Sequence, residues 1–188
     1  AGVLIRYDLT RNRIAKNALA FIQGGIQSYK QSMMRVDESM HSQDWSGVID
    51  HALTAARVAS RITQMATQQL DYFAAILASR DPEIVALQHH RSVDDQYAIQ
   101  LIAELTHDYS KKARRASEMC QTAVSRLEAE LSRATTPFDD EPIDTARLRG
   151  AAEQARMAAT TAERTSKHAS RVARDSEEHL KHIPVENE

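Results

Sequence analysis

The chain has 188 residues and a formal net charge of −2, with only 5 glycines, 4 prolines and 5% aromatic residues. Few turn residues and few aromatics exclude an all-β fold and favour long helices. The near-neutral charge attracts neither nucleic acid nor anionic lipid, a single cysteine excludes an intrachain disulfide, and no apolar run approaches the roughly 20 residues of a membrane span.

The first predicted helix covers about residues 10–41, with Thr10 as its N-cap. Apolar residues recur there at alternating intervals of four and three, the heptad pattern of a helix that packs against another helix. These positions are Ala15, Leu19, Ile22, Ile26, Tyr29, Met33, Val36 and Met40. Gly24-Gly25 interrupts the helix at a cost of about 2 kcal/mol relative to alanine. By hairpin counting the two glycines lie opposite roughly Ile62. We therefore expect either close packing against Met65 or another bulky residue, or a kink that lets the helix bend or open.

The second predicted helix covers about residues 44–80 and has the same periodicity. Its heptad positions are Trp45, Ile49, Ala52, Ala56, Ala59, Thr63, Ala66, Leu70, Phe73 and Leu77. Because the run from Ala52 to Ala66 is made of small residues, it predicts an unusually close approach of a neighbouring helix. The helix should stop at Arg80, where Asp81 as N-cap and Pro82 at the first helical position begin the next one.

The third predicted helix covers about residues 82–134. Ser92 and Asp95 match a second capping box, which would break this helix near 89–92. Its later heptad positions are Ala98, Ile102, Leu105, Tyr109, Ala113, Ala116, Cys120, Val124, Leu127 and Leu131. Cys120 falls on this seam with no histidine near it in sequence, so we expect a small core residue and not a nucleophile.

A loop follows at 135–142 (TTPFDDEP), and the fourth predicted helix covers about 144–182. Its heptad positions are Leu148, Ala152, Ala155, Ala159, Ala162, Ser166, Ala169, Ala173, Ser176, Leu180 and Ile183. Short connections make successive helices antiparallel. The sequence therefore predicts one all-α domain over 1–188, an elongated, up-down-up-down four-helix bundle with heptad, Ala-rich seams.

Two Glu-x-x-His motifs raise the question of a metal site: ESMH at 38–41 and ELTH at 104–107. Carboxylate-bridged di-iron bundles use this ligand pair twice. Folding the predicted helices as hairpins separates the two motifs by about 15 Å along the bundle, whereas the ions of a di-metal site lie roughly 3.5–4 Å apart. The histidine pair in EEHLKH (177–182) provides too few ligands for zinc. We therefore expect no metal and no cofactor.

The densest basic cluster is KKARR at 111–115, which makes Lys111, Lys112, Arg114 and Arg115 candidate interaction residues. A basic flank also follows the fourth helix: Arg149, Arg156, Arg164, Lys167, Arg171, Arg174 and Lys181. Pairs such as Glu163–Lys167 are spaced for ordinary ion pairs on a helix surface. No aromatics interleave with these basic residues, so nucleic acid is not favoured, while an acidic surface or a lipid headgroup stays an alternative.

The leading hypothesis is a non-catalytic helical bundle that acts through protein–protein contact or self-assembly, as a scaffold, an adaptor or a module of a larger secreted or structural protein. A protein partner or a homo-oligomer follows from it. The first alternative is the ligand-sensing bundle of a receptor, with its ligand between helices near Gly24 and Gly25. A di-metal bundle enzyme ranks last. The start AGVLIRYDLT lacks an initiator methionine, which indicates a processed protein or a segment of a longer one.

Overall fold

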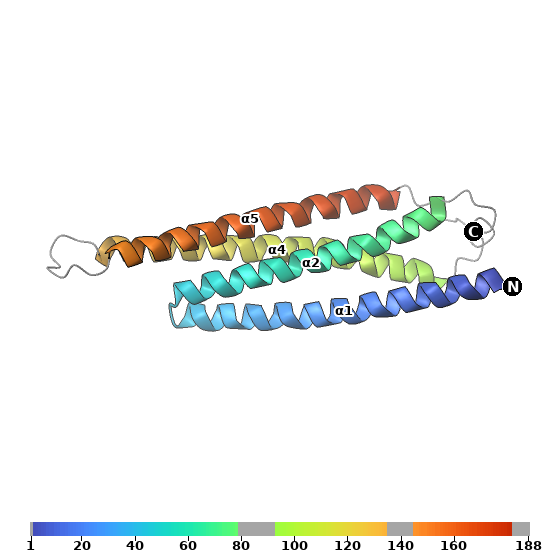
Figure 1. Ribbon diagram of the computed structural model, residues 1–188, viewed down its shortest axis with the longest axis horizontal. Coiled ribbons are helices and arrows are strands. Elements are labelled where there is room, and N and C mark those ends of the chain that lie inside the picture. Colours follow the sequence, from blue (N-terminus) through green and yellow to red (C-terminus); the bar gives the residue numbers. More distant parts are fainter. Residues whose placement is uncertain (1, 79–92, 135–144, 182–188) are drawn as a thin grey trace.

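A computed structural model of the chain describes residues 2–78, 93–134 and 145–181. These residues form four helices and no strand: α1 (Gly2–His41), α2 (Trp45–Ala78), α4 (Val93–Ala134) and α5 (Thr145–Lys181). The prediction of an all-α fold is confirmed. Figure 1 shows the helices side by side in an elongated molecule, with the turn between α1 and α2 near one end. No described helix is long and apolar enough to cross a membrane.

Helix α1 begins at Gly2 and not near the predicted cap at Thr10. The segment from Val3 to Leu9 contains neither proline nor glycine, so nothing in it breaks a helix, and the capping chemistry available at Thr10 is not used to start one. The predicted start at Asp81-Pro82, the break near 89–92, the loop at 135–142 and the end near 182 lie outside the described residues.

The turn between α1 and α2 has a Schellman motif. The amide of Asp44 donates to the carbonyl of Ser39 at 2.8 Å, and the amide of Gln43 donates to the carbonyl of Met40 at 3.1 Å. Gln43 has a φ of 56°, the left-handed conformation that this motif requires and that glycine adopts at lower cost. Asp44 then caps α2, because its Oδ1 accepts a hydrogen bond from the amide of Gly47 at 3.0 Å.

Helix α2 is the centre of the packing, because it contacts α1, α4 and α5. Helices α4 and α5 also pack against each other, whereas the close backbone contacts of α1 are with α2. In Figure 1, α2 and α4 lie between α1 and α5. A helix with three neighbours must bury a broad face. Beyond the predicted heptad positions, α2 accordingly also buries Val48, Ala55, Ser60, Ile62 and Thr67.

The core is made largely of small residues where α2, α4 and α5 meet. Fully or nearly fully buried alanines and serines lie on all three helices: Ala52, Ala55, Ala56, Ala59, Ala113, Ala116, Ser117, Ala123, Ala162, Ser166 and Ala169. The Cys120 thiol is close enough to donate to the backbone carbonyl of Ile49, with 3.8 Å between Sγ and O. A side chain as short as cysteine reaches the backbone of another helix only when the two helices lie close together.

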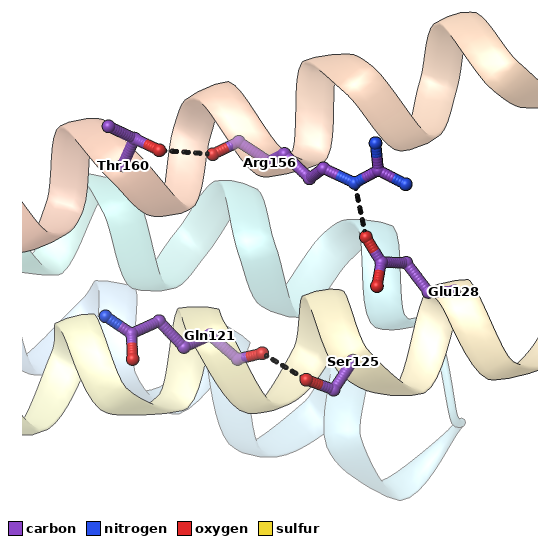
Figure 2. Close-up of polar contacts among 5 residues, drawn as sticks. All are labelled: Gln121, Ser125, Glu128, Arg156 and Thr160. Carbon is purple, nitrogen blue, oxygen red and sulfur yellow. Dashed lines mark hydrogen bonds and ion pairs between the residues drawn. The ribbon is translucent and has the colours of Figure 1, made fainter.

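The outer faces of α4 and α5 are joined by an exposed ion pair, in which Arg156 Nε donates to Glu128 Oε1 (Figure 2). On α5 itself, Lys167 pairs with Glu163 across 3.1 Å, at the spacing that the sequence indicated. Both pairs are largely solvated, and pairs of this kind contribute little to stability. The α4–α5 interface therefore depends on the small buried residues and not on these charges.

Candidate interaction surface

The first candidate region is an open groove of about 340 Å³ between α1 and α2. Phe21, Gly24, Gly25 and Ser28 line it from α1, and Val58, Arg61 and Ile62 line it from α2. The two glycines differ in surroundings. A Cβ at Gly25 would lie 2.9 Å from Ile62 Cγ1, whereas a Cβ at Gly24 would meet nothing within 4 Å. Gly25 therefore allows close packing against Ile62, and Gly24 leaves the groove open. We call this region the Gly24 groove.

Helix α1 is continuous through both glycines, and neither has a positive φ. Within 4 Å a Cβ at Gly25 would meet Ile62 and not Met65, so the bulky neighbour is Ile62 itself. Phe21, at one side of the groove, is 47% exposed, which is high for an aromatic side chain in a helical protein.

The four residues of the basic cluster of α4 have different surroundings. Lys111 and Arg114 are exposed. Lys112 is half-buried: its Nζ lies 3.0 Å from Asp108 Oδ2, and 4.5 Å and 5.7 Å from the ring centres of Tyr109 and Tyr29. Arg115 is exposed and lines a second groove.

Burial and the neighbouring groups shift the pKa of the Lys112 ammonium in opposite directions. Burial alone would lower the pKa of Lys112, but the hydrogen bond to Asp108 and the neighbouring tyrosines raise it above its usual value overall. Burial raises the pKa of both Tyr29 and Tyr109, more than the nearby Lys112 charge lowers it. At neutral pH the site therefore holds a charged lysine against two neutral phenols.

The second groove, of about 320 Å³, lies where the α1–α2 turn meets α4. Met40, Trp45 and Val48 line one side, and Arg115, Glu118, Met119, Thr122 and Ala123 line the other. Met40 is 38% exposed, and Trp45 and Met119 are half-buried. Most of the wall is thus apolar, with one positive and one negative side chain on α4. We call this region the Trp45 groove.

Trp45 is held in place by two polar residues of α4. Its indole Nε1 donates to Glu130 Oε1 at 3.0 Å, and the guanidinium of Arg126 lies 5.7 Å from the ring centre. Both contacts are exposed and place the ring on the surface of the groove. As the one tryptophan of the chain, it is also a spectroscopic probe of this region.

Cys120 behaves as the sequence indicated, as a core residue. Its side chain is fully buried, and burial, with a smaller effect from the Asp50 charge, raises the pKa of its thiol to about 11. A thiol with this pKa is protonated at neutral pH and is not a nucleophile.

The Glu-x-x-His motifs do not face the interior. Glu38, His41, Glu104 and His107 are all exposed. Among the residues that the structure describes, no group of three or more His, Cys, Asp or Glu side chains is arranged to hold a metal ion.

Sequence reasoning missed the Trp45 groove, because it treated Trp45 and Met40 only as heptad positions. A signal was available: the one tryptophan of the chain and a methionine, at 45 and 40, flank the same short turn. It also missed the tyrosines beneath Lys112, since Tyr29 is far from Lys112 in the sequence. The chain matches no protein-family model, and no curated protein or solved structure is detectably similar to it.

Proposed function

We propose that the protein is a non-catalytic helical bundle that acts through protein–protein contact, with the Trp45 groove as its contact surface. The proposal includes an up-down-up-down arrangement of antiparallel helices with heptad seams. On α1 the buried residues Ile22, Tyr29 and Val36 recur every seven positions, which supports such a seam. The contacts of Gly25 with Ile62 and of the α1 end with Asp44 and Gly47 support an antiparallel first hairpin.

The observation that carries the functional proposal is the composition of the Trp45 groove. Tryptophan, methionine and arginine are enriched in the buried centres of protein interfaces. Methionine also adapts its shape to an incoming partner. Here Met40, Trp45, Met119 and Arg115 line one open groove, and the Trp45 ring is already fixed by Glu130 and Arg126. Such a preformed anchor lowers the entropic cost of binding.

The largely apolar lining of the groove and its volume of about 320 Å³ suit an apolar side chain carried on a helix of the partner. Arg115 and Glu118 lie about one turn apart on α4, so they present opposite charges to residues that flank such an anchor. The partner is either a second copy of this chain or another protein.

Light scattering across a concentration series tests the self-assembly form of the proposal. The substitution Met40→Lys places a charge at the exposed edge of the groove, and Met157→Lys is the matched control, because Met157 is 65% exposed on α5 and does not line the groove. Self-assembly predicts an oligomer that Met40→Lys weakens and Met157→Lys preserves. If the wild-type protein stays monomeric at every concentration, the self-assembly form is wrong.

A ligand-sensing bundle is the second candidate function, and the Gly24 groove is the observation that favours it. The groove combines an exposed aromatic ring, Phe21, with a guanidinium, Arg61, beside open space at Gly24. These are contacts that a small molecule with an apolar body and an anionic group would use.

A thermal-shift screen of small molecules tests this second function. A ligand that binds the folded state should raise the melting temperature of the wild-type protein. Gly24→Leu fills the open space and should abolish the shift, whereas Gly150→Leu, at an equally open and exposed glycine of α5, should leave it intact. A shift that persists in Gly24→Leu would place the ligand elsewhere, and a screen without shifts would contradict ligand sensing.

A further inference from the structure

Helix α1 is attached to the rest of the molecule differently from the other three helices. Helices α2, α4 and α5 each contact the other two, so they make a mutually packed unit. The close backbone contacts of α1 are with α2, to which the Schellman turn also connects it. Separating α1 would therefore break contacts along one side of the unit while those among α2, α4 and α5 persist.

Toward α4, α1 reaches across with the side chain of Tyr29. The Tyr29 and Tyr109 rings meet edge to face, with 5.7 Å between their centres and an interplanar angle of 82°. Both residues are buried, at 7% and 3% exposure. Aromatic pairs in this geometry attract each other beyond the area that they bury.

Lys112 lies over both rings of this pair. Its ammonium is 4.5 Å from the centre of Tyr109, on the same helix, and 5.7 Å from the centre of Tyr29, on α1. Asp108, one turn earlier on α4, holds the ammonium at 3.0 Å and fixes its position. A cation within about 6 Å of a ring centre is attracted by the negative face of the ring, and the attraction grows when both are shielded from water.

The packing on either side of this junction is open. Gly25 lies one turn before Tyr29 and lines the Gly24 groove, while Arg115, which nearly follows Lys112, lines the Trp45 groove. Between the two grooves, the Tyr29, Tyr109 and Lys112 side chains join α1 to α4.

We propose that Lys112, Tyr29 and Tyr109 form a clasp that controls the separation of α1 from a persistent three-helix unit of α2, α4 and α5. The charge of the Lys112 ammonium closes the clasp, and a substitution that removes this charge lets α1 separate more often. The clasp is a property of the single chain and does not rest on the proposed contact function.

Hydrogen–deuterium exchange of the full chain tests the clasp, because it reports opening helix by helix. The substitution Lys112→Gln removes the charge, whereas Lys112→Arg keeps a cation that stacks well on aromatic rings. Lys167→Gln is the matched control: it removes a lysine in the same i, i+4 arrangement with an acid, Glu163, but no contact of Lys167 with an aromatic ring is found in the described structure.

In Lys112→Gln we expect amide exchange in residues 22–36 of α1 to accelerate on the order of fivefold, with α5 and the centre of α4 unchanged. Lys112→Arg and Lys167→Gln should leave the exchange of α1 within about twofold of wild type. Equal acceleration in all four helices would overturn the proposal, because it would mean that Lys112 contributes only to global stability. Unchanged exchange of α1 in Lys112→Gln would overturn it as well.

Discussion

The two glycines of α1 offer a pair of substitutions that tests the packing of the Gly24 groove. Neither glycine has a positive φ, so alanine fits the backbone at both positions. In a helix interior alanine is favoured over glycine by about 1 kcal/mol. At Gly24 the new Cβ meets nothing within 4 Å, so the full effect should be seen. We expect Gly24→Ala to raise the free energy of unfolding by about 1 kcal/mol.

At Gly25 the same substitution creates a steric clash. The new Cβ would lie 2.9 Å from Ile62 Cγ1 and 3.1 Å from Cδ1. Ile62 is only 1% exposed and β-branched, so its χ1 is restricted and its side chain moves away only at a cost. Overpacking of this kind costs about 1–3 kcal/mol, which cancels or exceeds the gain in helix propensity. We therefore expect Gly25→Ala to leave the protein unchanged or to destabilise it by up to about 2 kcal/mol.

Urea denaturation followed by far-UV circular dichroism measures both effects. With a slope of about 2 kcal/mol/M, Gly24→Ala should move the midpoint upward by roughly 0.5 M, and Gly25→Ala should not. Gly150→Ala on α5 is the control for an open, exposed glycine and should resemble Gly24→Ala. Equal stabilisation at Gly24 and Gly25 would refute the contact with Ile62, and destabilisation by Gly24→Ala would refute the open space beside Gly24.

Five further substitutions or conditions test other parts of the structure. Because burial raises the thiol pKa of Cys120 to about 11, iodoacetamide at pH 8 should label it only after unfolding; labelling of the folded protein would contradict its burial. Because the raised pKa keeps the Cys120 thiol protonated in the folded state, the contribution of this thiol to the free energy of unfolding is fully present below the unfolded pKa near 9. This contribution should be lost as the pH rises toward 11, which urea denaturation at a series of pH values measures. Asp44→Ala removes the cap of α2 and should cost about 1 kcal/mol by urea denaturation, whereas Gln43→Gly relieves a left-handed residue and should stabilise by about 1 kcal/mol. Thr67→Val replaces a buried hydroxyl that has no hydrogen-bond partner, so the melting temperature should rise and not fall.

The sequence was sufficient for the helical class and for much of the core. Periodicity selects Ile22, Tyr29 and Val36 on α1, and all three are buried. It also selects Cys120, whose burial follows from its place on an apolar face. The pattern works here because a helix in a bundle buries the centre of its apolar stripe against whichever helices neighbour it.

The periodicity of the apolar residues does not predict which helices contact one another. The periodicity of α2 gives one heptad stripe, yet α2 has three neighbours and buries Ala55, Ser60 and Ile62 as well. A run of small residues is compatible with contacts on several sides, so composition alone does not fix the number of neighbours.

In the candidate sites, too, the sequence does not predict which side chains from different helices lie together. The run KKARR indicates a charged surface, but the sequence does not reveal that Tyr29 from another helix lies beneath Lys112. The Trp45 groove likewise combines residues near 40–48 with residues 115–123, and their proximity depends on how α4 packs alongside α1 and α2. Gly24-Gly25 could be located in advance, because two glycines inside a helix conflict with local propensity and so need a reason in the packing.

Site-specific photo-crosslinking from the Trp45 groove tests the proposed contact function most directly. A benzophenone amino acid at Thr122, an exposed residue of the groove wall, should capture either a second copy of purified protein or one defined partner in a lysate of the source cells. The adduct should be lost in Met40→Lys and retained in Met157→Lys. A groove that gives no adduct, or an adduct that Met40→Lys leaves unchanged, would contradict the account.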